Sequence, residues 1–173
     1  MIRVDGLVML GKTKPELRRT DGRTFVCSAA WHPDLGLIRI YPLAVADAPQ
    51  DWGVYSVDLE RNPADNRPES WRIAAGRAPA DHPRINRQFT RTGTVPTSHR
   101  AATLDRAYQP ASLQQANTGR RSLAVLRPTG ARIEWDSPAG VFDHNQLALF
   151  QEDDPAAGLL PRVVFTDEDG YPH

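Results

Sequence analysis

A chain of 173 residues, 40% apolar and 24% charged, is long enough to bury one core and too short for two independent ones. It contains no run of roughly 20 apolar residues that would cross a bilayer, and its first residues lack the pattern of a secretory signal. We therefore expect a cytoplasmic protein without a membrane partner. The single cysteine, Cys27, excludes an internal disulfide and a multi-cysteine zinc site, and no cofactor is expected.

The formal net charge is zero, but the charges are sorted along the chain. Residues 1–60 carry −1, residues 61–132 carry +9 with thirteen arginines, and residues 133–173 carry −8. A basic segment attracts polyanions, because each phosphate that an arginine neutralises releases counterions. It therefore indicates a nucleic acid or a nucleotide as partner. The alternative is that the basic middle pairs with the acidic end inside the fold.

The N-terminal third alternates in the manner of strands. Residues 2–10 predict a first strand, and 24–31 with 36–43 predict a β-hairpin around the turn residues of "HPDLG". Polar and apolar side chains alternate over 53–62, which predicts a half-buried strand. The segment "DNRPESWRI", at 65–73, is then a loop at a strand end, where functional residues tend to collect.

Regular elements are expected to be shorter beyond residue 73. Residues 74–98 are rich in proline and arginine and predict an irregular, exposed excursion. Short helices are expected at 98–109 and at 110–119, the second ended by glycine. Further strands are expected for "RRSLAVLRP", for "ARIEW" and for the start of "PRVVFTDEDGYPH", which ends in an acidic turn, while "VFDHNQLALFQ" fits either a helix or a strand.

The 65–73 loop concentrates hydrogen-bonding groups. Arg67 and Arg72 bring forked donors, Glu69 an acceptor and Ser70 a hydroxyl, and Pro68 keeps Arg67 extended, so the loop is preorganised. One interpretation is a clamp for phosphate or carboxylate, in which Glu69 orients an arginine or transfers a proton. The other is a buried Arg–Glu pair that ties the loop to the hairpin.

Aromatic residues interleave with the arginines. Tyr41 follows Arg39 by two residues and Trp71 precedes Arg72, so both rings offer a surface on which a base stacks. The alternative role for each ring is core filling.

No metal site is expected. The histidines show no metal-binding spacing, and "DEDGYPH" lacks the alternate ligands and the closing glutamate of a calcium loop. Cys27 is expected to be an ordinary buried strand residue. In an extended strand, His32 lies about 16–17 Å from it and is a poor partner for nucleophilic catalysis.

Segments along nearly the whole chain resemble a family of uncharacterised bacterial and phage-associated proteins. They are "GKTKP", "VCSAAW", "LIRIYPL", "NPADNRPESWRI", "SLAVLRP" and "FTDEDGYPH", of which "RPES" and "RIYP" are the most specific. The family pattern combines a lysine-threonine loop, a VCTAG-like strand, an R-[IL]-YP strand, a D-x-RPES-[YW] loop and an SL-G-[IV]-x-P strand. Ala30 stands where that pattern has glycine, and the Asp-Trp-Glu run that follows the family's last histidine is absent from this sequence.

The resemblance implies one constellation that comprises Lys12, Arg39, Tyr41, Arg67, Glu69 and Ser70. It implies no activity.

Together these observations predict an α+β fold, with one β-rich domain over residues 1–173 built on an antiparallel bent sheet or partial barrel with short helices. The leading hypothesis is a nucleic-acid or nucleotide binding module. A second is a small enzyme acting on a nucleotide or phosphodiester, with Glu69 as catalytic acid or base. A third is a protein–protein adaptor that docks through the acidic segment 133–173, and the oligomeric state stays open. The expected binding residues are Lys12, Arg39, Tyr41, Arg67, Ser70, Trp71, Arg72, Arg84, Arg87 and Arg91.

Overall fold

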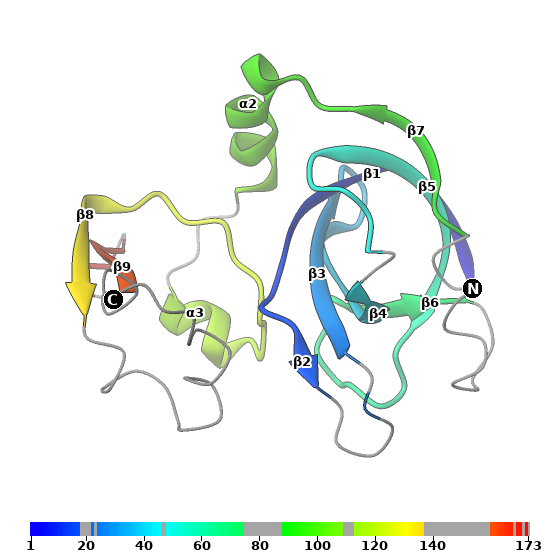
Figure 1. Cartoon of the computed structure of the whole chain (residues 1–173), viewed down its shortest axis with the longest axis horizontal. Coiled ribbons are helices and arrows are strands. Elements are labelled where there is room, and N and C mark those ends of the chain that lie inside the picture. Colours follow the sequence, from blue (N-terminus) through cyan, green and yellow to red (C-terminus); the bar gives the residue numbers. More distant parts are fainter. Residues whose placement is uncertain are drawn as a thin grey trace, which may run out of the picture. The chain divides into compact units, whose positions relative to one another are not determined.

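The computed structural model describes residues 1–17, 22, 24–45, 48–74, 88–108, 113–136, 160–167, 169–170 and 172. These residues gather in two compact units, Met1–Val125 and Leu126–His173, which are described one at a time (Figure 1). Arg84, Arg87 and the segment "VFDHNQLALFQ" lie outside the described residues. The expectation of one domain over the whole chain stays a prediction.

The first unit is built on a closed barrel. Its five strands follow the order β1-β3-β4-β6-β5, and β5 pairs back with β1, so the sheet has no free edge in the barrel. Figure 1 shows these strands curving around one another in a ring. The predicted β-rich α+β fold with a bent sheet or partial barrel is confirmed. The strands are β1 (Ile2–Lys12), β3 (Thr24–His32), β4 (Gly36–Ala44), β5 (Gly53–Arg61) and β6 (Ser70–Ile73).

Closure depends on the length and the bend of β1. Residues 2–8 of this strand pair with β5, and residues 8–12 pair with β3. Gly6 has φ 81° at the register shift between Val4 and Leu7. This region of φ is open to glycine and unfavourable for other residues, so Gly6 lets the strand turn from one partner to the next.

The connectivity is that of the OB-fold barrel. All neighbouring pairs are antiparallel except β4 and β6, the third and fifth strands of the ring in chain order, which run parallel. Two short strands lie outside the ring: β2 (Glu16–Leu17) pairs with β3, and β7 (Thr90–Thr94) pairs with β5. A five-stranded Greek-key barrel of this kind supports many functions, so the fold alone assigns none.

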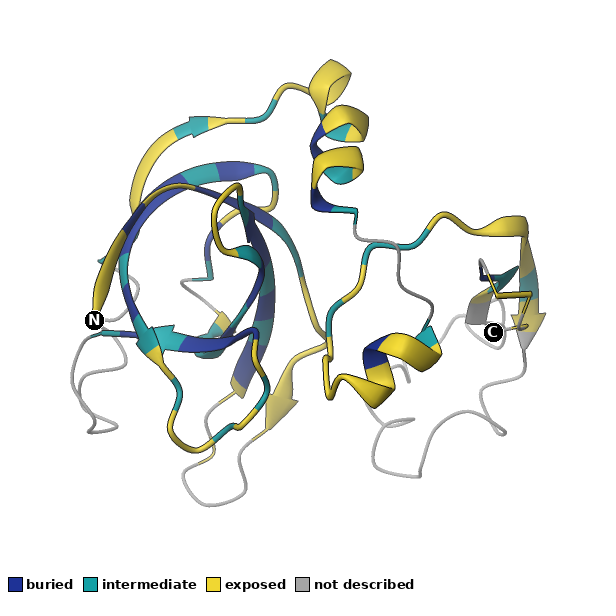
Figure 2. Ribbon diagram, turned by 180° about the vertical axis from the view of Figure 1, so that it is seen from behind, coloured by how far each residue is buried: buried dark blue, intermediate teal, exposed yellow. Residues whose placement is uncertain are grey.

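The barrel core follows the alternation of side chains along its strands. In β4, Ile38 and Ile40 are fully buried, whereas Arg39 and Tyr41 on the other face are half-buried. Figure 2 shows buried residues along the ring of strands. The polar centre of β4 therefore lies outside the core, where a site can form. The core residues are Val4, Leu7, Met9, Val26, Ala30, Ile38, Ile40, Leu43, Tyr55, Val57, Leu59, Trp71 and Ile73.

The expected hairpin and helices are present. Residues 24–31 and 36–43 form the antiparallel β3–β4 pair, and two helices, α2 (Thr97–Ala107) and α3 (Leu113–Thr118), occupy the expected segments.

The expectation of a loop over 65–73 is wrong in its second half. Residues 70–73 form β6, because their backbone pairs with both β4 and β5.

The strand expected at "RRSLAVLRP" is also wrong. Residues 121–128 carry no strand; instead Leu123 and Val125 pack on a second apolar cluster that contains Val8, Trp31 and Leu37. Burial without a neighbouring strand explains the apolar pattern. Of the excursion expected at 74–98, the described part includes β7 and the start of α2.

The second unit contains one antiparallel pair, β8 (Thr129–Asp136) with β9 (Leu160–Thr166), as the sequence predicts for "ARIEW" and "PRVVF". Glu134 forms ion pairs with Arg132 and Arg162 at 2.7 and 2.9 Å. After β9, Asp167 accepts a hydrogen bond from the backbone N–H of Asp169, which forms the predicted turn. None of the helices in the part of the chain described here is long and apolar enough to span a membrane.

Candidate functional site

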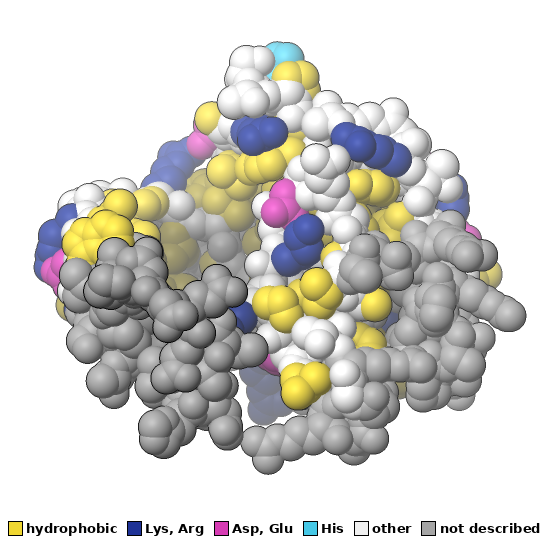
Figure 3. Space-filling view, in the orientation of Figure 1, with side chains coloured by type: hydrophobic (Ala, Val, Ile, Leu, Met, Phe, Trp, Pro, Cys, Tyr) yellow, Lys and Arg dark blue, Asp and Glu magenta, His cyan; other side chains and the backbone are white. Residues whose placement is uncertain are grey.

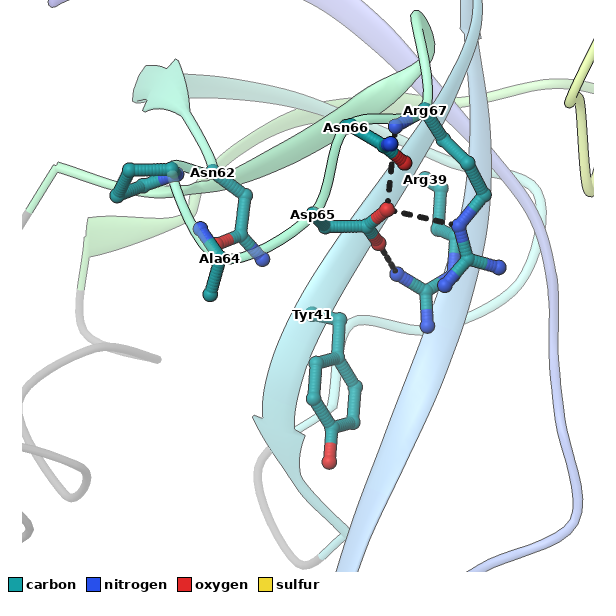
Figure 4. Close-up of a pocket in the computed structure, with 8 residues that line it drawn as sticks. Arg39, Tyr41, Asn62, Ala64, Asp65, Asn66 and Arg67 are labelled. Carbon is teal, nitrogen blue, oxygen red and sulfur yellow. Dashed lines mark hydrogen bonds and ion pairs between the residues drawn. The ribbon is translucent and has the colours of Figure 1, made fainter.

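Asp65 is the centre of a hydrogen-bonded cluster outside the barrel core. Its Oδ2 accepts from Arg39 Nη1 at 2.7 Å and from Ser70 Oγ at 2.9 Å. Its Oδ1 accepts from Arg67 at two points, the Nε at 2.8 Å and the backbone N–H at 3.2 Å (Figure 4). One carboxylate thus holds two guanidinium groups.

This arrangement lowers the pKa of Asp65 to about 2, chiefly through the hydrogen bond from the Arg67 side chain, and burial opposes that shift. The same hydrogen bond raises the pKa of Arg67. Asp65 and Arg67 are therefore charged at neutral pH, and the second guanidinium, that of Arg39, leaves one positive charge in excess in this cluster.

The backbone of the 62–69 loop positions the cluster. The side chain of Asp65 accepts a hydrogen bond from the backbone N–H of Arg67, two residues further on, which makes an Asx-turn. The backbone N–H of Ser70 donates to the Arg67 carbonyl at 3.0 Å. The Arg61 guanidinium donates to the carbonyl of Pro68. Because the loop is held at several points, it is preorganised, as the proline predicts.

The parallel pair of strands brings Arg39 to the loop. Arg39 lies opposite Ser70 in the β4–β6 register, and its backbone N–H donates to the Glu69 carbonyl at 2.8 Å. Its Nη2 donates to Cys27 Sγ at 2.9 Å, and its guanidinium carbon lies 5.1 Å from the centre of the Tyr41 ring. Both Nη groups of Arg39 therefore have a partner within the protein.

Arg67 is held less completely. Its Nε is bound by Asp65, but its two Nη groups have no acceptor among the residues that the structure describes. Its side chain is 36% exposed, against 12% for Arg39. Arg67 therefore presents a fork of N–H donors that a ligand is able to use.

Two hollows meet at these arginines, since Arg39 and Arg67 line both. The first, here called the tyrosine hollow, has a volume of about 510 Å³ and is also lined by Tyr41, Asn62 and Asn66. The second, called the lysine hollow, has a volume of about 460 Å³, and its lining includes Lys12, Thr13, Cys27, Ser28, Glu16 and Ser122.

The lysine hollow combines a cation with hydroxyl groups. Lys12 Nζ lies 3.5 Å from Asp51 Oδ1 in a half-exposed pair, which solvent weakens. Thr13 Oγ1 accepts from the Cys27 N–H at 3.0 Å. The hydroxyl of Ser28 is fully buried and has no hydrogen-bond partner within the described part of the chain. Glu16 is exposed and adds a negative charge at the rim.

Glu69 lies apart from both hollows. It is 4% exposed, and its Oε1 accepts from Ser122 twice, from the backbone N–H at 2.5 Å and from Oγ at 3.0 Å. Its other oxygen has no partner among the described residues. Glu69 therefore ties the segment after α3 to the barrel, and no contact here assigns it the catalytic role expected from the sequence.

The structure brings together five of the predicted site residues: Lys12, Arg39, Tyr41, Arg67 and Ser70.

The other predicted binding residues that the structure describes, Trp71, Arg72 and Arg91, do not line the hollows. Trp71 is in the barrel core, with the Arg61 guanidinium 4.1 Å from its ring centre, so no base is able to stack on it. Arg72 is paired with Glu60 at 2.6 Å, and Arg91 on β7 donates to Thr94.

Asp65, Thr13 and Asn66 also line the hollows, although they are not among the residues that the sequence predicts for the site. The role of Asp65 in the turn was predictable, because an aspartate in a loop often accepts a hydrogen bond from the backbone N–H two residues further on. Among the described residues, no three side chains of the metal-binding types lie together.

A family model described as "Domain of unknown function (DUF8758)" matches residues 4–104. The chain belongs to this family. The matched region runs from β1 into α2, so it contains the whole lining of the tyrosine hollow and all of the lysine hollow except Ser122 and Leu123. No curated protein and no solved structure matches the chain. The prediction that the chain belongs to an uncharacterised family is thus confirmed for residues 4–104.

Proposed function

We propose that the chain is a nucleic-acid or nucleotide binding module that holds a phosphate group at Arg39 and Arg67. One observation carries the proposal: two guanidinium groups share the single carboxylate of Asp65. One positive charge is left in excess, and the Arg67 fork has no acceptor within the described residues. A planar fork of N–H donors matches two oxygens of a phosphate.

Preorganisation favours this role. The cluster around Asp65 fixes Arg39 and the Nε of Arg67 before any ligand arrives. A ligand therefore meets donors whose conformational entropy has already been lost, which strengthens binding. Lys12 in the lysine hollow adds a donor for a further phosphate oxygen.

The position of the site on the barrel supports the same class of ligand by analogy of fold. OB-fold barrels bind oligonucleotides and oligosaccharides on the face of their second and third strands, between the first and the last connecting loops. Here those strands are β3 and β4, the first connection is the one between β1 and β3, and the last is the 62–69 loop. Cys27, Arg39, Tyr41 and Asp65 lie on these elements. A nucleic-acid ligand also fits the cytoplasmic location expected from the sequence.

The test is binding of a dye-labelled single-stranded oligonucleotide, followed by fluorescence anisotropy across a salt series. We expect binding that weakens as salt rises, and Arg67→Gln weakens it at least tenfold, because a charged hydrogen-bond pair is lost. The matched control is Arg3→Gln. Arg3 also carries one charge on the barrel, but it is 48% exposed and paired with Asp5 and Asp58.

The control variant should bind like the wild type. If Arg3→Gln and Arg67→Gln weaken binding equally, the hollows are not the site. Absence of any nucleotide or oligonucleotide binding at low salt refutes the function.

A further inference from the structure

The two hollows differ in chemistry although they share their arginines. The lysine hollow presents the amino group of Lys12 and the two shared guanidinium groups, which suit a phosphate, with the carboxylate of Glu16 at its rim. The tyrosine hollow presents an aromatic ring and two amides, which suit a flat, hydrogen-bonding group. Each volume, about 510 and about 460 Å³, lies in the range of small-molecule sites.

The tyrosine hollow is open between its walls. Figure 4 shows Asn62 and Ala64 on one side, Arg39 and Arg67 on the other, and the ring of Tyr41 between them at a different level. The amide of Asn66 has no hydrogen-bond partner among the described residues, and that of Asn62 uses only its oxygen, which accepts from the Ala64 N–H. Amide donors and acceptors are therefore left for the edge of a base.

On the face shown in Figure 3, the lysine and arginine side chains that are coloured stand apart, separated by apolar and uncharged ones. The described cations Arg3 and Arg72 are paired with carboxylates. Among the described residues, Lys12, Arg39 and Arg67 are the cations that line the two hollows.

We infer that the ligand is one unpaired nucleotide unit, with its base in the tyrosine hollow against Tyr41 and its phosphate in the lysine hollow beside Lys12. Arg39 and Arg67 stand between base and phosphate and contact both parts. This inference rests on the proposed function and makes it narrower. A base inside a duplex is stacked and paired, so it cannot enter the tyrosine hollow without unpairing. A nucleoside monophosphate carries every group that the two hollows bind.

Two binding comparisons test the unpaired nucleotide. In the first, a single-stranded oligonucleotide is compared with a duplex of the same sequence, and we expect the single strand to bind at least tenfold tighter. In the second, a mixture of the four nucleoside monophosphates competes with the labelled strand, and we expect complete displacement. Equal binding of duplex and single strand, with the Arg67→Gln effect intact, overturns this inference while the proposed function stands. Displacement by inorganic phosphate at the same concentration as the monophosphates also overturns it.

Variants in the tyrosine hollow test the place of the base. Asn66→Ala changes an exposed loop amide without a partner, so it should fold normally. We expect Tyr41→Leu to weaken binding of the monophosphates about tenfold, since stacking on the ring is lost, and Asn66→Ala to weaken it severalfold. Neither should change the binding of inorganic pyrophosphate, which Arg67→Gln should weaken. If both variants bind monophosphates like the wild type, the base does not occupy this hollow.

Discussion

Replacing Asp65 by asparagine removes the charge that holds Arg39 and Arg67 together and keeps the size of the side chain. Breaking a buried ion pair on one side costs about 3–5 kcal/mol. Asp65 and Arg39 are 11% and 12% exposed, but Arg67 is 36% exposed and solvent screens its share. We therefore expect Asp65→Asn to lower the free energy of unfolding at pH 7 by about 2–3 kcal/mol.

The pKa of Asp65 leads to a similar value by a second route. It falls from 3.8 to about 2 on folding, which corresponds to about 2.5 kcal/mol of stability. Because the folded pKa is the lower one, this stability is fully present above pH 3.8 and is lost as the pH falls toward 2. The difference in the free energy of unfolding between wild type and Asp65→Asn should therefore be constant from pH 7 to pH 5 and should become smaller below pH 3.8.

Urea unfolding followed by tryptophan fluorescence measures this difference at pH 7, 5 and 3. Asp34→Asn is the matched control, because Asp34 is an exposed aspartate in the β3–β4 turn that makes no ion pair with a described residue. It should change the free energy of unfolding by less than about 0.5 kcal/mol. Two results would refute this account of Asp65. One is a difference in the free energy of unfolding between wild type and Asp65→Asn that is the same at pH 5 and pH 3. The other is a difference of less than about 1 kcal/mol at pH 7.

Two further predictions concern the frame of the site. Glu69→Ala removes the charged acceptor of two hydrogen bonds from Ser122 and should lower the free energy of unfolding by about 2–3 kcal/mol, whereas Glu69→Gln retains an oxygen acceptor and should cost less than half of that. Equal thermal stability of Glu69→Ala and the wild type would show that this contact does not stabilise the barrel. Gly6→Ala should cost about 1–2 kcal/mol, because φ is 81° there. Gly11→Ala, at a glycine of ordinary φ with open space around it, should stay within about 0.5 kcal/mol of the wild type in the same urea titration.

Local pattern was sufficient for most strands. In residues 24–31 and 36–43, turn residues between two apolar runs predict the hairpin, because the turn and both strands are close in the chain. The alternation in β4 likewise separates Ile38 and Ile40 from Arg39 and Tyr41, since successive side chains of a strand point to opposite faces. The polar face that carries the site was thus predictable before its neighbours were known.

Long-range pairing decided the parts that local pattern misjudged. Residues 70–73 become β6 because β4, about thirty residues earlier, and β5 both offer backbone partners. That pairing places Trp71 in the core, although polar residues, Ser70 and Arg72, flank it in the sequence. The segment after α3 has the composition of a strand, but its apolar residues are buried against the barrel without a partner strand.

By itself, the sequence determined the strand-rich class, the hairpin and the polar face of β4, because these depend on composition and on a period of two along the chain. Only the tertiary structure decided which of the charged groups act together. The parallel pairing of β4 and β6 places Arg39 opposite Ser70. Asp65, which accepts a hydrogen bond from Ser70, also accepts one from Arg39 Nη1 at 2.7 Å. Glu69, by contrast, accepts from Ser122. Ion pairs between residues 26 positions apart depend on strand register, which no local pattern specifies.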